Sequence, residues 1–309
     1  MDADRTIWLP ATYKIPPRLP DPDVTFTSVE VGPIPGRYRL LVRASDVVRW
    51  ASLHDDDPRR YRSEDGTPIA PPSILYFASM NLLGREWKGG GFARYAAQFL
   101  GAVPIGQPID VSAVVVDKFL RRGRGWIVWR LDAMVNGQLI QRHWKVWAFE
   151  IAPGDEVGWP GEDYQPVPFG NWVTAQSSSP PDPLPTRTLA ITLGRMADFE
   201  GPGEDNVHTN PVIALERYGA APVAQGELSF GLLCSALHDA VGNRFSLDGA
   251  LDVRFLKPVH AGDVLTTRGE LRSTGARSME CRVDVVNQHG EVVTTGGAVA
   301  GASDVQRAS

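Results

Sequence analysis

Apolar strand-like segments, separated by short polar turns, recur in both halves of the chain. They cover residues 109–119, 125–135 and 139–149 in the first half, and 264–271, 278–286 and 292–299 in the second. Apolar runs bounded by turn residues are typical of strands. Asn136-Gly137 is a strong signal for a two-residue hairpin turn. We therefore predict a run of antiparallel strands in each half.

An internal repeat lies just before each of these runs. Its apolar and glycine positions are Phe99, Leu100, Val103 and Gly106 in the first copy and Phe255, Leu256, Val259 and Gly262 in the second. The offset between the copies is constant at 156 residues. A constant offset indicates that one structural unit has been made twice.

A helix is predicted ahead of each copy of the repeat, at Ser73 to Leu83 and at Glu227 to Val241. The second helix places apolar residues on one broad face, namely Leu228, Phe230, Leu232, Leu233, Ala236, Leu237 and Ala240. Gly242-Asn243 marks its end. Such a helix is about 22 Å long, which is enough to cross a curved sheet.

Each half thus has the same predicted order of a loop, a buried helix and antiparallel strands. This is an α+β arrangement in which a sheet wraps one helix, made twice. A stretch rich in Pro, Gly and Ser, including residues 177–181, separates the halves. We predict an N-terminal unit at 1–152, a connection at 153–186 and a C-terminal unit at 187–309, as the length of 309 residues suggests.

Two segments of the second half resemble the MaoC-like proteins of the hotdog fold. One is the strand and turn from Phe255 to Leu265, with the sequence FLKPVHAGDVL. The other is Asn206-Val207-His208-Thr209-Asn210, followed by Pro222-Val223-Ala224-Gln225-Gly226. Because the first half repeats the second, the resemblance implies a double hotdog over nearly the whole chain. It also implies similarity to (R)-specific enoyl-CoA hydratases and 3-hydroxyacyl-thioester dehydratases.

The resemblance implies a catalytic Asp/His pair and a backbone N–H, at the start of the central helix, that holds the thioester carbonyl. Here His208 takes the histidine's place and Gly226 supplies the N–H. The chemistry suits these groups, because imidazole exchanges protons near neutral pH and a helix N-terminus stabilises a developing enolate oxygen. Gln225, Trp50 and Trp87 are expected to contact the substrate.

The sequence departs from the family pattern, Gly-Asp-any-Asn-Pro-aliphatic-His, at the acid. Gly203 stands five residues before His208, as though the proline had been deleted. Asn206 then matches the asparagine of the pattern, and Glu204 or Asp205 supplies the carboxylate. The other interpretation is that both acidic residues lie in a solvated loop and that His208 is an ordinary loop histidine.

The first half shows the complementary departure. It keeps Asp55 at the acid position and Pro58, but Arg60 occupies the histidine position. Arginine cannot act as a base at neutral pH. We therefore expect the C-terminal half to carry the chemistry and the N-terminal half to form a substrate tunnel. Seven of the nine Trp lie before residue 150 and either pack in the core or wall a cavity for a bulky acyl group.

Composition narrows the class of protein. The chain is 43% hydrophobic and 22% charged, with a net charge of −5, so nothing favours nucleic acid or an acidic membrane surface as a partner. Two cysteines exclude a disulfide framework and fit a reducing compartment. No stretch is long and apolar enough to span a bilayer and residues 1–20 lack a signal-peptide core, so we expect a cytoplasmic protein. We expect no metal and no cofactor, because no spacing resembles a zinc site or a phosphate-binding loop.

The leading hypothesis is a hydro-lyase that hydrates a 2-enoyl thioester or dehydrates a 3-hydroxyacyl thioester, in a specialised biosynthetic pathway or in fatty-acid breakdown. Coenzyme A or the phosphopantetheine of an acyl carrier protein then belongs to the substrate. The missing aspartate leaves a thioesterase or an acid/base-promoted cyclase as an alternative. A non-catalytic acyl-binding or partner subunit is the third possibility. Two fused units can close a dimer-like interface within one chain, so we expect a monomer or a homodimer.

Overall fold

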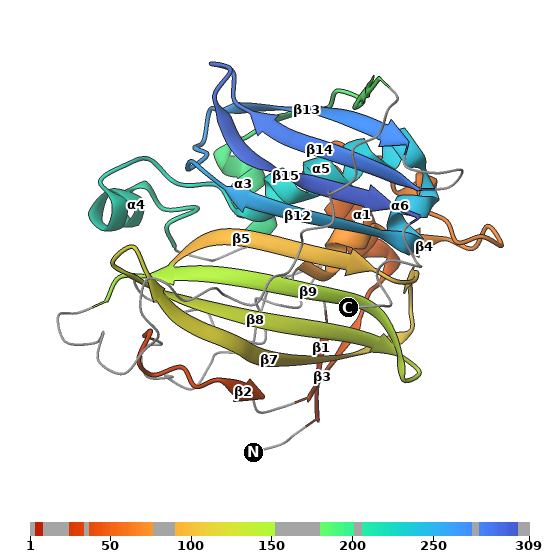
Figure 1. Cartoon of the computed structure of the whole chain (residues 1–309), viewed down its shortest axis with the longest axis horizontal. Coiled ribbons are helices and arrows are strands. Elements are labelled where there is room, and N and C mark those ends of the chain that lie inside the picture. Colours follow the sequence, from red (N-terminus) through yellow and green to blue (C-terminus); the bar gives the residue numbers. More distant parts are fainter. Residues whose placement is uncertain are drawn as a thin grey trace.

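The computed structural model of the chain describes residues 4–8, 25–33, 37–76, 90–151, 180–200, 206–273 and 278–301. Within these stretches, 13 strands form one large sheet in the order β1-β3-β7-β8-β9-β5-β12-β15-β14-β13-β10, with β2 beside β7 and β11 beside β13 (Figure 1). A separate short pair joins β4 (Ile69–Ala70) to β6 (Val103–Pro104).

The sheet takes strands from both halves of the chain. The first half supplies β1 (Asp4–Trp8), β2 (Gly32–Pro33), β3 (Arg37–Leu41), β5 (Gly90–Phe99), β7 (Pro108–Arg121), β8 (Arg124–Val135) and β9 (Gln138–Phe149). The second half supplies β10 (Asp182–Pro183), β11 (Thr188–Ala190), β12 (Gly249–Phe255), β13 (Val264–Ser273), β14 (Met279–Val286) and β15 (Val292–Ala300). The six strands predicted by the apolar pattern are all present, each with bounds within two residues of those expected.

The two copies of the internal repeat meet at the centre of the sheet. β5 and β12 pair antiparallel, with Phe99 opposite Gly249. From this junction the strand order runs β9-β8-β7 on one side and β15-β14-β13 on the other. Gly106 and Gly262 both have positive φ, 77° and 101°, which explains why glycine is repeated at this turn. The predicted duplication of one α+β unit is therefore confirmed.

The predicted hairpin between β8 and β9 is also present. Asn136 and Gly137 have φ values of 51° and 80°, and Val135 pairs with Gln138 across the turn. Two central residues with positive φ characterise a type I′ turn, whose twist matches that of the flanking strands.

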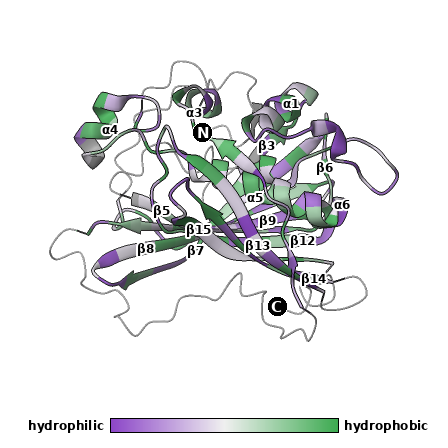
Figure 2. Ribbon diagram, turned by 90° about the horizontal axis from the view of Figure 1, so that it is seen from above, coloured by the Kyte–Doolittle hydropathy of each residue, from purple (hydrophilic) through white to green (hydrophobic). Residues whose placement is uncertain are grey.

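Helices lie on one side of the sheet, as seen from above (Figure 2). The described α-helices are α1 (Ala44–Leu53), α3 (Leu193–Glu200), α4 (Pro211–Tyr218), α5 (Gly226–Val241) and α6 (Asn243–Asp248). Two 3₁₀ turns, η1 (Pro58–Arg60) and η2 (Pro72–Leu75), belong to the first half. The helix expected at 73–83 therefore begins as a 3₁₀ turn, with proline as its first residue, and residues 77–89 lie outside the described part.

The predicted central helix is α5, which begins one residue earlier than expected and ends at Gly242 with φ of 66°. One apolar face was expected, but every residue from Glu227 to His238 is buried. The helix is enclosed because it runs between the strands on one side and elements of the first half on the other. Ala240, expected on the buried face, is only half-buried.

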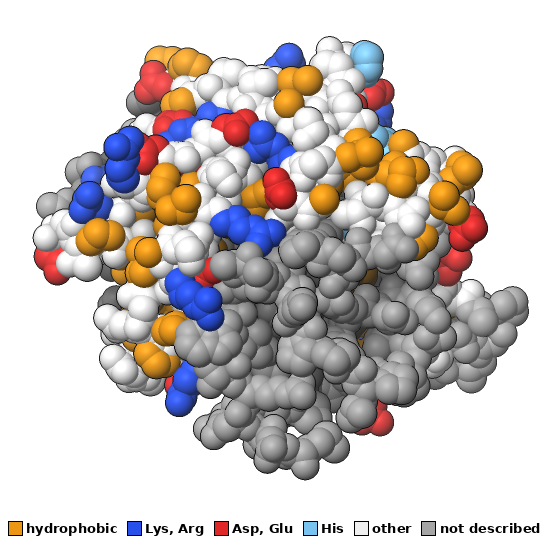
Figure 3. All heavy atoms as spheres, turned by 180° about the vertical axis from the view of Figure 1, so that it is seen from behind, with side chains coloured by type: hydrophobic (Ala, Val, Ile, Leu, Met, Phe, Trp, Pro, Cys, Tyr) orange, Lys and Arg blue, Asp and Glu red, His pale blue; other side chains and the backbone are white. Residues whose placement is uncertain are grey.

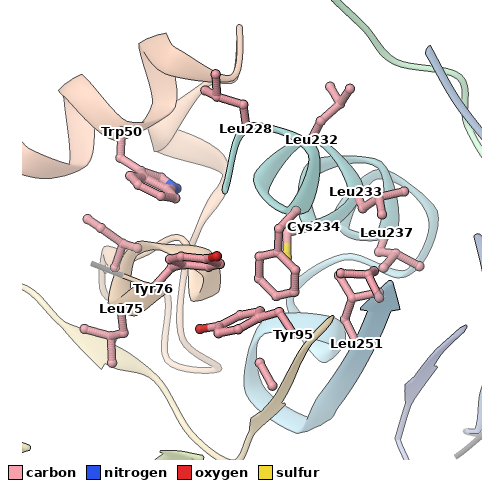
Figure 4. Packing of buried hydrophobic residues seen from close by; sticks show 14 of the residues in the cluster. Trp50, Leu75, Tyr76, Tyr95, Leu228, Leu232, Leu233, Cys234, Leu237 and Leu251 are labelled. Atoms are coloured by element: carbon pink, nitrogen blue, oxygen red, sulfur yellow. The ribbon is translucent and has the colours of Figure 1, made fainter. Parts of the chain in front are cut away.

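One apolar core spans both halves of the molecule. Close to α5, side chains of the helix such as Cys234 and Leu237 face Tyr76 and Tyr95 of the first half and Leu251 of β12 (Figure 4). Folding of either half alone would expose this shared surface. The two units are thus joined by a common core as well as by the continuous sheet.

The boundaries between the predicted units stay a prediction, because residues 152–179 of the expected connection lie outside the described part. At its C-terminal end the connection includes β10, which pairs with Glu270 and Leu271 of β13. Among the described helices, none is long and apolar enough to cross a membrane. On the face seen in Figure 3, the described basic and acidic side chains are interspersed.

Candidate functional site

His208 lies in a short turn that precedes α4. Asn206 shapes this turn, because its side-chain oxygen accepts the His208 backbone N–H at 2.8 Å. Asn210 then caps α4 by accepting the N–H groups of Val212 and Ile213 at 2.8 and 3.3 Å. Asn206, matched to the asparagine of the family pattern, therefore positions the histidine through the backbone.

The imidazole of His208 is held by a backbone carbonyl. Its Nδ1 lies 2.5 Å from the oxygen of Val223. A carbonyl only accepts hydrogen bonds, so Nδ1 carries a proton, and in the neutral form of the ring Nε2 holds the lone pair. The half-buried side chain thus has a defined tautomer, with Nε2 as the nitrogen that can accept a proton.

Three segments far apart in the sequence hold this arrangement together. The N–H of Val223 donates to Val207 at 3.3 Å, and the N–H of Ala224 donates to Val259 at 2.7 Å. Val223 and His260 also form an isolated bridge. The turn that carries His208 is therefore bonded to the strand-like segment that leads directly into α5.

The first turn of α5 begins at Gly226. The first N–H groups of a helix have no partner within it, and they form the positive end of the helix dipole. The side chain of Gln225 does not cap them, and its amide nitrogen donates to the Met196 carbonyl at 3.1 Å. A Cβ added at Gly226 would lie 3.0 Å from the ring of Phe255 and 3.2 Å from that of Phe92. Only glycine fits here without moving a ring.

The other predicted site residues have different placements. Gln225 is buried beside Gly226. Trp50 is buried in the core, where its indole N–H donates to the Ser73 hydroxyl at 2.9 Å and its ring packs on Phe199. Glu204, Asp205 and Trp87 lie outside the described residues, so the choice between the two carboxylates stays open.

The residues of the first half that correspond to the acid and histidine positions of the family pattern, Asp55 and Arg60, belong to a network of ion pairs. Arg60, at the histidine position, contacts the carboxylates of Asp56 at 2.9 Å and Asp239 at 2.6 Å. Asp55, at the acid position, has φ of 49° and pairs with Arg195 at 3.0 Å. These residues link the first half to α5 and α3, which gives them a structural role.

Sequence reasoning missed a group of buried polar residues in the first half. Gln141, His143 and Lys145 on β9 are at most 2% exposed, as is His54 at the end of α1. The only sequence signal was the spacing of two residues between Gln141, His143 and Lys145, which places their three side chains on one face of the strand. Because these three side chains are polar, the alternation of polar and apolar residues would predict that this face of the strand is exposed to water.

Comparisons with known proteins agree with this architecture. A family model described as the thioesterase superfamily matches residues 218–294, and no curated protein sequence matches the chain. A solved MaoC-like dehydratase has a TM-score of 0.66 at 14% identity, covering 85% of this chain and 97% of its own. The MaoC-like dehydratase of Phytophthora capsici has a TM-score of 0.65 at 14% identity, covering 87% and 95%.

A Mycobacterium tuberculosis protein described as having a double hotdog fold matches with a TM-score of 0.61 at 12% identity, covering 90% of this chain and 97% of its own. The chain is a double hotdog. The predicted resemblance to MaoC-like proteins is confirmed as a likeness of fold. In this double hotdog, α5 is the central helix of the second unit, and His208 lies beside the segment that starts it.

Proposed function

We propose that this double hotdog is a hydro-lyase that hydrates a 2-enoyl thioester or dehydrates a 3-hydroxyacyl thioester. One observation carries the proposal: the Nδ1 of His208 is bonded to Val223, three residues before Gly226 begins α5. A proton-accepting nitrogen and a helix N-terminus are thereby fixed to the same short segment. Addition or removal of water next to a thioester needs both of these groups.

In this proposal the thioester carbonyl accepts hydrogen bonds from N–H groups at the start of α5, including that of Gly226. Negative charge that develops on this oxygen, when a proton leaves or joins C2, is stabilised by these preorganised donors. His208 Nε2 exchanges a proton with the reacting water or hydroxyl. Glu204 or Asp205 supplies the second acid/base group, and each is a separate prediction.

The carrier in this proposal is coenzyme A or an acyl carrier protein, and the reaction needs no further cofactor. Gln225, Trp50 and Trp87 stay proposed substrate-binding residues. Since Trp50 is buried in the core and bonded to Ser73, its contribution would be to shape the wall of the acyl site.

Thioester hydrolysis is the second candidate. It is favoured by the match of the thioesterase superfamily over residues 218–294, a range that includes all of α5 and most of the strands that wrap it. Hydrolysis would use the same helix N-terminus for the carbonyl, with His208 activating water for attack at the carbonyl carbon. The two reactions differ in product, because only hydrolysis releases a free thiol.

The test is to incubate the purified protein with trans-2-enoyl-CoA substrates of increasing chain length. Loss of the conjugated enoyl absorbance reports hydration, and a thiol reagent reports hydrolysis in parallel. We expect hydration that is lost in His208→Ala and in one of Glu204→Gln and Asp205→Asn. His289→Ala is the matched control, because His289 is exposed in the turn before β15.

Thiol release that depends on His208 would replace the lyase with a thioesterase. Binding of the enoyl-CoA without either conversion would favour the non-catalytic acyl-binding subunit. Full hydration activity in His208→Ala would refute the assignment of the active histidine.

A further inference from the structure

The interior of the first hotdog unit contains polar side chains close to the start of α5. β9 turns Gln141, His143 and Lys145 inward, and their exposed fractions are 0%, 1% and 2%. Glu227, the second residue of α5, points towards them and is also buried. The proposed reaction uses none of these four groups. Buried polar groups are costly unless they are bonded, so each needs a partner.

Two of them belong to a closed hydrogen-bond chain. The amide nitrogen of Gln141 donates to the Pro72 carbonyl at 3.0 Å, so its oxygen must accept from His143 Nε2 at 2.9 Å. Nδ1 of His143 is then an acceptor, and it lies 2.5 Å from the hydroxyl of Tyr95. Burial lowers the pKa of His143 to about 3, with Lys145 adding to the effect, and the ring is neutral. This chain is satisfied within the protein.

Lys145 is different. Within the described part of the chain its ammonium nitrogen has no hydrogen-bond partner, and the nearest carboxylate oxygen, on Glu227, is 3.8 Å away. Four aromatic rings surround this nitrogen, with centroids at 3.9 Å (Tyr76), 5.0 Å (Phe92), 5.6 Å (Tyr95) and 5.8 Å (Trp129). The rings favour a cation but accept no conventional hydrogen bond. The N–H groups of Lys145 are donors in need of an acceptor.

Lys145 and Glu227 lie close to the proposed carbonyl site at Gly226. Glu227 directly follows Gly226 in the first turn of α5. Phe92 touches both places, since its ring lies 3.2 Å from a Cβ built on Gly226 and 5.0 Å from the Lys145 nitrogen. An acyl group whose carbonyl is held at Gly226 therefore begins about one aromatic ring away from Lys145.

We propose that Lys145 and Glu227 form a subsite for a hydroxyl group on the acyl chain, beyond the reacting carbons. The inference rests on the proposed function, because it places the thioester carbonyl at Gly226. A hydroxyl can accept a hydrogen bond from Lys145 and donate one to Glu227. The separation of 3.8 Å is less than two hydrogen-bond lengths of about 2.8 Å, so one oxygen can reach both groups.

Other acyl groups fit this pair less well. A carboxylate would accept from Lys145 but would also face the negative charge of Glu227. A plain alkyl chain would leave the Lys145 donors without an acceptor and so gain nothing from the pair. The acyl class indicated is a neutral one that carries a hydroxyl.

The test uses two matched pairs of probes: 4-hydroxybutanoyl-CoA against butanoyl-CoA, and 6-hydroxyhexanoyl-CoA against hexanoyl-CoA. None of the four has a 2,3 double bond or a 3-hydroxyl, so the proposed reaction cannot consume them. Calorimetric titration of the wild-type protein should give a Kd about tenfold or more lower for the hydroxylated member of at least one pair, as expected for hydrogen bonds to charged groups.

Lys145→Met should remove this preference and leave the affinity for the plain acyl probe within about twofold. Because that variant removes the positive charge that faces the Glu227 carboxylate, the double variant Lys145→Met/Glu227→Gln is measured as well, since it removes both charges. Lys118→Met is the matched control. Lys118 is also buried in the first unit, but its ammonium donates to the Val29 carbonyl at 2.8 Å, and the variant should keep the preference.

Equal Kd values within both pairs would overturn the inference, and so would a preference that survives in both Lys145 variants. If no probe binds at all, the inference fails together with coenzyme A as the proposed carrier. Conversion of enoyl-CoA without any hydroxyl preference would refute this subsite alone and leave the proposed function intact.

Discussion

The imidazole of His54, at the end of α1, lies directly against Gly231 in the middle of α5 and occupies the space that a side chain at position 231 would need. The ring is fixed in this position, since its Nδ1 lies 2.9 Å from the Trp50 carbonyl and its Nε2 lies 3.4 Å from that of Glu227. Burial lowers the pKa of His54. This contact joins the first unit to the central helix of the second.

Gly231→Ala should destabilise the protein by about 1–3 kcal/mol, because an added Cβ would overlap the His54 ring. Urea unfolding followed by circular dichroism measures the change. His54→Ala/Gly231→Ala should be less destabilised than the sum of the two single variants, since removal of the ring relieves the overlap. Additive effects would show that the two residues do not press on one another.

Asp56→Asn should destabilise the protein by about 3–5 kcal/mol at neutral pH. The carboxylate is 2% exposed, accepts from Tyr61 and Ser235 at 2.5 and 2.7 Å, and pairs with Arg60 and Arg187. Burial alone would raise the pKa of Asp56, but these hydrogen bonds and charges hold it below its ordinary value.

A lowered folded pKa means that this stabilisation is complete above the unfolded value of about 3.9 and is lost as the pH falls through the folded value. The stability difference between wild type and Asp56→Asn should therefore shrink below about pH 4. Asp110→Asn is the control, because that carboxylate is 48% exposed and pairs with Arg39 at the surface. A difference in unfolding free energy between wild type and Asp56→Asn that stays constant down to acid pH would contradict the prediction.

Lys145→Met should change how stability depends on pH above neutrality. Burial lowers the pKa of Lys145 to about 7, with Glu227 acting in the opposite direction. Between this value and the unfolded value of about 10.4 the unfolded state binds more protons, so the wild type gains stability as the pH rises. Urea titrations between about pH 7 and pH 9.5 should show a steeper rise for the wild type than for Lys145→Met.

That pH window lies below the range in which ionisation of the neighbouring tyrosines affects stability. Burial and Glu227 raise the pKa values of Tyr76 and Tyr95, which lowers folded stability only above the ordinary tyrosine value of about 10. His143, with a pKa of about 3, is neutral throughout. Parallel curves for the two proteins would mean that Lys145 titrates normally.

Gly226→Ala should lower kcat/KM for enoyl-CoA about tenfold or more, if the proposed function holds. The added Cβ would push on the rings of Phe255 and Phe92 and displace the first N–H groups of α5 from the carbonyl. Gly101→Ala is the control, since its Cβ would meet Ile140 at 3.5 Å, an ordinary contact. Steady-state kinetics with unfolding curves for both variants separate lost catalysis from lost stability, and unchanged kinetics would argue against this carbonyl site.

Much of the fold could be predicted, because the signals are local. A two-residue turn with Asn136-Gly137 has few alternatives to a type I′ hairpin, and the apolar run of α5 is bounded by Gly226 and Gly242. The repeat predicted two copies of one unit. It did not predict that β5 and β12 pair at the centre of one continuous sheet, because pairing between strands about 150 residues apart depends on tertiary packing and not on local sequence.

For the candidate site, too, some features could be predicted from the sequence and others depended on the tertiary structure. The sequence alone indicated His208, Gly226 and the absence of a histidine at position 60, because these follow from residue identity within a motif. Only the tertiary structure decided that Nδ1 of His208 is held by Val223 and that Lys145 faces inward towards Glu227. A side chain's tautomer, partners and burial depend on segments distant in the chain, and local sequence does not determine which of those segments become neighbours.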